Sequence, residues 1–204
     1  MRSNIQAVLF DLGGVLIRLR GVKVLLSHLQ GRMDEAELFR RWLYSPSVRL
    51  FESGGCNLDH FCRNIVGELS LPMNTDEFLQ IFRTFLEAPY PGAAEHLPLI
   101  AAQVRTGILS NTSAPHWLMA REMLPEIDAL PDLFLSYRMG LLKPDSDMFR
   151  KVLSDLALPA ESVLYFDDHP ANVEAARSLG IQAVPVLGFH DCLEALAALG
   201  IYQN

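Results

Sequence analysis

The chain has 204 residues, half of them hydrophobic and a fifth of them charged. This composition is typical of a globular protein large enough to bury a core, and it excludes disordered, collagen-like and coiled-coil proteins. Asp and Glu total 24 against 17 Lys and Arg, which gives a formal net charge of −7. No cluster of basic residues stands out, so we expect no nucleic-acid partner.

The cysteines and the apolar segments indicate a reducing, aqueous location. Cys56, Cys62 and Cys192 have no paired spacing, so we expect free thiols and neither a disulfide framework nor a zinc site. The N-terminal residues lack the long apolar segment of a secretory signal. No apolar run reaches the ~18 residues of a membrane span. We therefore expect a cytoplasmic protein without a membrane partner.

The first predicted element is a buried parallel strand over residues 5–10 (IQAVLF), which stops abruptly at Asp11. The chain from about residue 20 to residue 88 is predicted to be helical, and we expect no strand in it. The expected N-caps of its helices are Asp34, Asn57 and either Asn74 or Thr75.

After the Pro- and Gly-rich residues 89–92, helical and apolar segments alternate in the pattern of βαβ units. Four further strands are predicted at residues 104–109, 132–137, 162–166 and 181–186. The expected fold is therefore α/β, with a Rossmann-like core built on a five-stranded parallel sheet. Residues 1–17 and 89–204 would form this core domain, and residues 18–88 would form a small inserted all-helical domain.

Polar side chains follow three of the predicted strands, at the edge where open α/β sheets bind ligands. These residues are Asp11 after the first strand, Ser110 and Asn111 after the second, and Asp167 and Asp168 after the fourth. Lys143 precedes the helix that leads to the fourth strand. Three acids, a hydroxyl and a lysine are therefore expected to meet at one edge of the sheet.

Each of these groups has two interpretations. Close carboxylates repel each other, and a hard divalent cation such as Mg²⁺ resolves the repulsion. Alternatively, Asp167 and Asp168 only cap the helix that follows them. Ser110 and Asn111 either hold an anion at a helix N-terminus or cap that helix. Lys143 is either a counter-charge for a phosphate or a solvated loop lysine.

The order of these motifs resembles the haloacid dehalogenase superfamily, most closely its sugar-phosphatase-type members. The superfamily's four motifs correspond in order to residues 11–16 (DLGGVL), Ser110-Asn111, residues 143–145 (KPD) and Asp167-Asp168. Together the motifs span residues 5–180, nearly the whole chain. The helical insertion lies where many members carry a small helical cap.

The resemblance implies a nucleophile and a metal site. Asp11 would attack phosphorus, form an aspartyl-phosphate and also ligate Mg²⁺. The backbone carbonyl of Gly13 would be a second ligand. Asp168 would be the direct acidic ligand from the fourth motif, with Asp167 behind it or acting through a water.

The resemblance also implies how a phosphoryl group is held. Ser110 and the Asn111 amide would hold phosphoryl oxygens, and Lys143 would neutralise charge on the nucleophile and the phosphate. The expected activity is a Mg²⁺-dependent phosphatase that acts on a small phosphorylated metabolite, with sugar phosphates favoured. The protein would be a monomer or a homodimer.

Gly13 departs from the superfamily pattern. Phosphatases of the superfamily usually carry a second Asp two residues after the nucleophile, where it acts as general acid and base. Positioned proton transfer of this kind is typically worth ~10²–10⁴-fold in rate. His169 or a cap acid such as Asp59 could replace it, or the substrate could have a good leaving group.

Two other functions remain open. The chain could be a non-catalytic phosphate-binding or regulatory protein that keeps the metal ligands without efficient turnover. It could also be a metal-free 2-haloacid dehalogenase, since these relatives lack the second Asp as well. The adjacent Asp167 and Asp168 argue against that function, because three acids without a cation repel each other. The cap side chains to consider first for contact with a substrate are Trp42, Tyr44, Arg49, Phe51 and His60. Alternatively, they belong to the core of the helical segment, because an aromatic residue at helical spacing is more often a core residue than a pocket residue.

Overall fold

The computed structural model describes residues 4–29 and 31–203. Its centre is a five-stranded sheet in the order β5-β4-β1-β6-β7, and every neighbouring pair is parallel. The strands are β1 (Ala7–Phe10), β4 (Arg105–Ser110), β5 (Asp132–Leu135), β6 (Val163–Asp167) and β7 (Gln182–Pro185). The predicted α/β fold with five parallel strands is confirmed.

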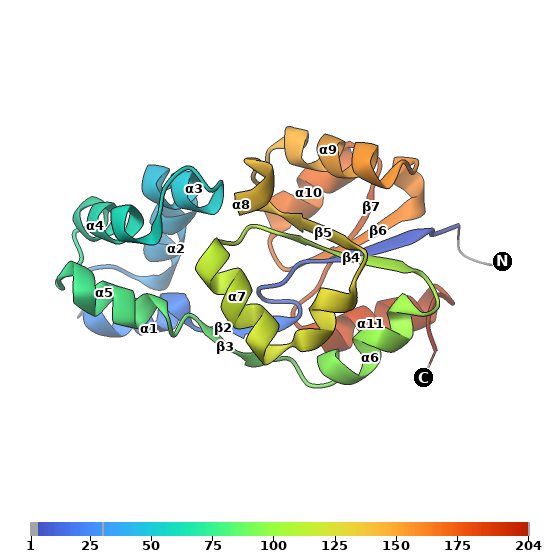
Figure 1. Ribbon diagram of the computed structural model, residues 1–204, viewed down its shortest axis with the longest axis horizontal. Helices are drawn as coiled ribbons and strands as arrows, with labels where there is room; N and C mark the ends of the chain where they lie inside the picture. The colour runs from blue at the N-terminus through green and yellow to red at the C-terminus, as the bar shows by residue number, and fades with distance from the viewer. Residues whose placement is uncertain (1–3, 30, 204) are drawn as a thin grey trace.

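Helices cover both faces of this sheet (Figure 1). One face packs against α6 (Ala93–Ala101), α7 (Ala114–Met123), the 3-10 helix η1 (Pro125–Ala129) and α11 (Phe189–Ala198). The other face packs against α9 (Ser146–Leu156) and α10 (Pro170–Ser178). The short elements α8 (Ser136–Met139) and η2 (Ala160–Ser162) lie in the connections that lead to α9 and to β6.

Strand β1 illustrates why the strand sequences are apolar throughout. Val8 and Phe10 pack into the core on one face, and Ala7 and Leu9 pack into the core on the other. All four side chains are buried because successive residues of a strand point to opposite faces and both faces are covered. The first polar residue after this strand therefore lies at the edge of the sheet.

The described residues of the inserted segment form five helices, which we call the cap helices. They are α1 (Gly21–Leu29), α2 (Glu35–Leu43), α3 (Pro46–Glu52), α4 (Leu58–Glu68) and α5 (Thr75–Phe82). They lie together beyond the end of the sheet, at the left in Figure 1, and they bury an apolar core of their own. The division into a core of residues 1–17 and 89–204 and an insertion of residues 18–88 stays a prediction.

The predicted caps of three cap helices are confirmed. The side chains of Asp34, Asn57 and Asn74 accept hydrogen bonds from backbone N–H groups in the first turns of α2, α4 and α5. Asn74 and Glu77 form a reciprocal capping box. Local side-chain chemistry therefore fixes where these helices begin.

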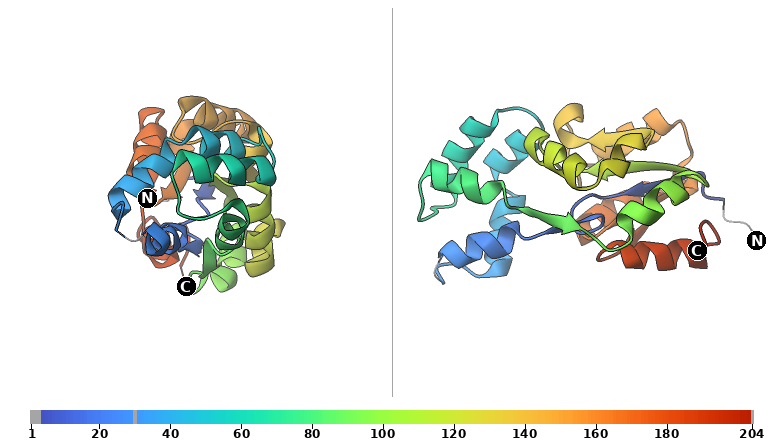
Figure 2. Two further views of the ribbon diagram at one scale, coloured as in Figure 1. Left: turned by 90° about the vertical axis from the view of Figure 1, so that its left-hand side faces the viewer. Right: turned by 60° about the horizontal axis from the view of Figure 1, so that its bottom comes forward.

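The expectation of no strand between residues 20 and 88 is wrong. β3 (Leu86–Pro89) pairs antiparallel with β2 (Ile17–Leu19), and the helix before β3 ends at Phe82. These strands have three and four residues, so neither shows a periodicity, and their pairing joins segments far apart in sequence. Figure 2 shows how the two strands connect the cap helices to the rest of the molecule.

No helix in the described part of the chain is long and apolar enough to span a membrane. Cys56, Cys62 and Cys192 are free thiols, as predicted.

Candidate active site

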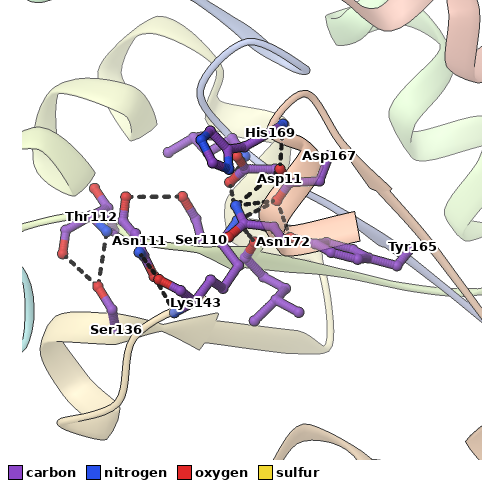
Figure 3. A network of polar contacts seen from close by, with 12 residues as sticks. Asp11, Ser110, Asn111, Thr112, Ser136, Lys143, Tyr165, Asp167, His169 and Asn172 are labelled. Carbon is purple, nitrogen blue, oxygen red and sulfur yellow. Dashed lines mark hydrogen bonds and ion pairs between the residues drawn. The ribbon is translucent and has the colours of Figure 1, made fainter. Parts of the chain in front are cut away.

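The polar residues singled out in the sequence meet at the carboxyl edge of the sheet (Figure 3). Asp11 directly follows β1, Ser110 ends β4 and Asp167 ends β6. Because β4 and β6 are the two neighbours of β1, their last residues lie on either side of Asp11. Lys143 reaches the same edge from the connection between α8 and α9.

Lys143 is the buried cation of the site, with 2% of its surface exposed. Its Nζ lies 3.0 Å from Oδ1 of Asp11 and 2.7 Å from Oδ2 of Asp167. It also donates to the Leu109 carbonyl at 3.0 Å and to the Tyr165 hydroxyl at 2.9 Å. Burial alone would lower the pKa of this lysine, but Asp11 and Asp167 raise it above its ordinary value. Lys143 is therefore a charged group and not a solvated loop lysine.

Asp167 is fully buried and fully occupied by donors. Besides Lys143, it accepts from the Tyr165 hydroxyl, from the His169 N–H at 2.8 Å and from Asn172 Nδ2 at 3.0 Å. Burial would raise its pKa, but the Lys143 charge and these donors lower it. Asp167 is thus an ionised anchor for Lys143, which agrees with a position behind a metal ligand.

Three carboxylates converge beside Lys143. Asp11, Asp167 and Asp168 each offer an oxygen, and these oxygens lie within 4.8 Å of one another. Burial raises the pKa of Asp11 to about 7, with Lys143 opposing the shift and Asp167 adding to it. Burial and the neighbouring Asp167 also raise the pKa of Asp168. Converging carboxylates that resist ionisation fit a hard divalent cation, for which carboxylate oxygens are the preferred ligands.

The loop after Asp11 is shaped for close approach to this cluster. Gly14 has a φ of +75°, and a Cβ built there would overlap the carboxylate of Asp168. A glycine is therefore required both by the left-handed backbone and by the contact. The loop therefore lies against the carboxylate of Asp168.

Ser110 and Asn111 play different structural parts. Asn111 exchanges two hydrogen bonds of 2.8 Å with the backbone of Lys143, so its side chain holds the lysine loop in place. Among the described residues, the hydrogen bond of Ser110 Oγ is a long one of 3.4 Å, donated to the Asn111 carbonyl. The N-cap of α7 is Ser113, so the interpretation of Ser110 and Asn111 as helix caps is wrong.

The interpretation of Asp167 and Asp168 as caps of α10 is also wrong. That helix begins at Pro170, and its N-cap residue is His169, whose side chain makes no capping hydrogen bond. Proline at the first position lacks an N–H, which lowers the need for a capping acceptor. Asp168 instead lines the polar cavity, and Asp167 holds Lys143.

Two adjoining cavities lie between the sheet edge and the cap helices. The first, of about 180 Å³, is polar on the sheet side, where it is lined by Asp11, Ser110, Asn111, Lys143, Asp168 and His169. The second, of about 170 Å³, is lined mainly by Leu25, Leu38, Phe39, Trp42, Phe85 and Leu86. Glu52 of α3 lines both cavities.

The five cap residues considered for contact with a substrate divide into three groups. Trp42 lines both cavities and Arg49 lines the polar one. Phe51 is buried in the core of the cap helices. Tyr44 and His60 are exposed and line neither cavity.

Asp59 and His169, the two residues considered as replacements for an acid at Gly13, lie in different places. Asp59 has 72% of its side chain exposed and pairs with Arg63 on the surface of α4. His169 lines the polar cavity, and its Nδ1 is buried without a hydrogen-bond partner in the described part of the chain. Glu52 could not be predicted from the sequence, because no local pattern distinguishes it from an exposed helix glutamate.

Tyr165 was missed for a different reason. It lies two residues before Asp167 on β6, so the two side chains share a face of the strand and hydrogen bond to each other. This spacing is visible in the sequence and could have identified Tyr165.

Known proteins similar to this chain include both enzymes of terpene chemistry and sugar-alcohol phosphatases. The drimenol cyclase of Aspergillus calidoustus is 26% identical over 88% of this chain, which spans only 34% of the cyclase. The sesquiterpene phosphatase of Aspergillus oryzae is 28% identical over 98% of this chain and 100% of the phosphatase. The D-ribitol-5-phosphate phosphatase of Bacteroides thetaiotaomicron is 22% identical over 87% of this chain and 90% of that enzyme.

Two solved structures share the fold. A haloacid dehalogenase-like hydrolase from Porphyromonas gingivalis has a TM-score of 0.79 and 22% identity, over 98% of this chain and 100% of the other. A haloacid dehalogenase family enzyme from Bacteroides thetaiotaomicron, in complex with magnesium and inorganic phosphate, has a TM-score of 0.70 and 21% identity over 89% and 93%. The family model of haloacid dehalogenase-like hydrolases matches residues 5–180, from the first predicted strand to beyond Asp168. The chain belongs to this family of hydrolases.

Proposed function

We propose that this chain is a Mg²⁺-dependent phosphatase that hydrolyses a small phosphate monoester through an aspartyl-phosphate on Asp11. The observation that carries the proposal is the buried Lys143, which pairs with both Asp11 and Asp167 beside a polar cavity. A nucleophilic carboxylate next to a fixed cation suits attack on phosphorus, because the attacked phosphoryl group carries negative charge.

The donor set supports a metal of the Mg²⁺ type. Asp11, Asp168 and the Gly13 carbonyl would hold it, with Asp167 anchored behind them by Lys143. When bound, Mg²⁺ would supply positive charge that offsets the charge of the phosphoryl oxygens. The solved magnesium and phosphate complex of the Bacteroides family member supports this assignment.

The chain's own residues would carry the reaction in two steps. In the first step an Asp11 oxygen bonds to phosphorus and the bond from phosphorus to the leaving alcohol breaks. Ser110 Oγ and the Asn111 N–H hold phosphoryl oxygens, and the charge of Lys143 favours the ionised form of Asp11. In the second step water attacks phosphorus, inorganic phosphate leaves, and the Asp11 carboxylate is restored.

The second cavity supports a substrate whose alcohol is largely apolar. Leu25, Leu38, Trp42 and Phe85 line it, and its volume of about 170 Å³ is similar to that of cavities that accept benzene. These apolar side chains offer no hydrogen bonds to the hydroxyls of a sugar phosphate, and the polar residues that also line the cavity include Glu52, Thr112 and His116. Relatives of both kinds exist, since one acts as a sesquiterpene phosphatase and another as a ribitol-phosphate phosphatase. Sugar phosphates remain the competing substrate class.

Phosphate release from a panel of esters tests the proposal. The panel contains an isoprenyl phosphate, a sugar phosphate and an aryl phosphate, each assayed with Mg²⁺ and with a chelator. We expect Mg²⁺-dependent release that is fastest for the apolar esters and is abolished in Asp11→Asn.

Three results would contradict it. Metal binding without phosphate release from any ester would indicate a phosphate-binding protein. Chelator-resistant halide release from a 2-haloacid would indicate a dehalogenase. Full activity of Asp11→Asn would exclude the covalent mechanism.

A further inference from the structure

The geometry points to Glu52 as the general acid and base of the hydrolysis, in the role that an acid at the position of Gly13 would otherwise fill. This inference rests on the proposed function and adds a catalytic residue contributed by the cap helices. Glu52 is the last residue of α3 and lines both the polar cavity and the apolar cavity. Among the described residues that line both cavities, Glu52 is the only one with a carboxyl group. It therefore lies between the phosphoryl site and the compartment of the leaving alcohol.

The backbone of Glu52 is fixed to the phosphate-holding loop. Its carbonyl accepts a hydrogen bond of 2.6 Å from Ser136 Oγ at the start of α8. The same Ser136 oxygen accepts from the Thr112 N–H at 2.9 Å, one residue after Asn111. A single buried hydroxyl thus joins the end of α3 to the loop that would hold phosphoryl oxygens.

Two further contacts hold the end of α3 against the core. Gly54 has a φ of +76°, and a Cβ built there would overlap the carbonyl of Tyr137. Arg49 on the same helix pairs with Asp145 of the core at 2.7 Å. A proton-transferring group has to be held in place to be effective, and these contacts position Glu52.

The surroundings of Glu52 suit proton transfer near neutral pH. Burial raises its pKa from 4.5 to about 7, with Lys143 and Arg49 lowering it and Asp11 raising it. A general acid works best when its pKa lies near the operating pH, because both protonation states are then populated.

The other titratable groups near the leaving-group side are poorly suited. Burial lowers the pKa of His116 to about 4, so its ring is neutral at pH 7, and Nε2 lies 3.1 Å from the Phe82 carbonyl. Its Nε2 proton is therefore already donated. His169 lines the polar cavity next to Asp168 and does not line the apolar one.

The proton balance of the two steps is as follows. As Asp11 bonds to phosphorus, the ester oxygen leaves and takes the proton of the Glu52 carboxyl, so a neutral alcohol and a Glu52 carboxylate result. The carboxylate then takes a proton from the water that attacks phosphorus. The bond from phosphorus to Asp11 breaks, phosphate leaves, and Glu52 is protonated again.

Glu52→Gln and Glu52→Asp test this role, with Glu35→Gln on α2 as the control. Glu35 is exposed on another cap helix and lines neither cavity. For an alkyl phosphate we expect Glu52→Gln to lose ~10²–10⁴-fold in kcat, and Glu52→Asp to recover part of the loss. Glu35→Gln should match the wild type. Thermal unfolding confirms that each variant is folded.

An aryl phosphate separates proton transfer from a purely structural role. Its phenolate leaves without protonation, so Glu52→Gln should release one equivalent of phenol in a burst and then turn over slowly. With the alkyl phosphate, the decline of wild-type kcat above about pH 7, where Glu52 loses its proton, should disappear in this variant.

Absence of the phenol burst, with equal losses on alkyl and aryl esters and an unchanged pH profile, would overturn the inference and leave Glu52 a structural residue. Wild-type rates in Glu52→Gln would overturn it as well. In both cases Asp11→Asn would still be inactive and the proposed phosphatase function would stand. Failure of that function would instead appear as no phosphate release by the wild type, or as an active Asp11→Asn.

Discussion

At the sheet edge Lys143 and Asp167 are both buried and joined by a contact of 2.7 Å, whereas on the cap helices the pairs Arg41–Glu37 and Arg63–Asp59 lie in solvent. Removing one partner of a buried pair leaves an uncompensated charge, whereas an exposed pair contributes about 0–1 kcal/mol. A substitution at the sheet edge that removes one of these charges is therefore expected to lower the stability of the fold as well as to change the site.

The cap helices are held together by apolar packing. Phe51 and Phe61 stack with ring centroids 4.3 Å apart, and Phe82 packs against both Phe61 and His116 of the core. Substitutions in the cap can therefore alter the cavity wall without removing a buried charge. We infer that the charged residues at the sheet edge carry the proposed reaction, and that the cap helices select the alcohol of the substrate.

The largest expected effect comes from Lys143→Met. The substitution leaves Asp11 and Asp167 without their cation, so we expect a loss of ~3–5 kcal/mol in the free energy of unfolding and loss of phosphate release. Denaturant unfolding measures the first effect. Lys151→Met is the matched control, because Lys151 pairs with Asp155 on the surface of α9, and it should change stability by no more than ~0.5 kcal/mol. Equal stability of the two variants would contradict the difference that we expect between buried and exposed ion pairs.

Gly14→Ala should weaken metal binding while the fold is kept. A Cβ at Gly14 overlaps the Asp168 carboxylate and sits on a left-handed backbone, so the loop or the acid has to move. We expect the Mg²⁺ concentration for half-maximal activity to rise at least ~10-fold, equivalent to about 1.4 kcal/mol. Gly67→Ala in α4 is the control, because a Cβ there meets no atom within 4 Å. An unchanged Mg²⁺ requirement in Gly14→Ala would exclude the proposed metal site.

Phe39→Ala should alter substrate selectivity more than chemistry. Phe39 is exposed on α2, lines both cavities and stacks on His169 with ring centroids 5.6 Å apart. Loss of this wall should lower kcat/KM for an isoprenyl phosphate by ~10-fold and leave a small aryl phosphate nearly unchanged. Equal losses on both esters would show that Phe39 supports the sheet edge and not the leaving alcohol.

The smallest expected effect is a pH dependence of stability at the contact between the cap and the core. Because burial lowers the pKa of His116 from 6.5 to about 4, the folded state takes up its proton later than the unfolded chain. The stabilisation that neutral His116 gives the folded state is complete above pH 6.5 and is lost as the pH falls towards 4. Thermal unfolding at a series of pH values should show a shallower acid decline in His116→Gln than in the wild type. The raised pKa of Glu52 makes stability fall as the pH rises, which is the opposite dependence. The wild type and His116→Gln both contain Glu52, so their unfolding temperatures are compared with each other at each pH.

The sequence predicted the parts of the site that lie next to a strand end. Asp11, Ser110 and Asp167 follow or end apolar strands, and the parallel sheet brings such residues to one edge. Lys143 was placed by its position in the motif order. The α/β fold was predicted from the alternation of apolar and helical segments, which is also a local pattern in the sequence.

The contribution of the cap helices depends on packing that no local pattern encodes. The contact between Glu52 and Ser136 joins residues 84 positions apart, and the pairing of β2 with β3 joins segments almost as distant. The apolar cavity arises only when Leu38 and Phe85 are brought together over the sheet edge. These features follow from how the helices dock and not from their amphipathic patterns.

The most direct measurement is acid-quenched mass spectrometry of the peptide that contains Asp11, after mixing the protein with an aryl phosphate and Mg²⁺. A phosphoryl group on Asp11 during turnover, absent from Asp11→Asn and absent with a chelator, is the predicted result. Steady phosphate release by Asp11→Asn, with the phosphoryl group on another residue or on none, would contradict Asp11 as the nucleophile.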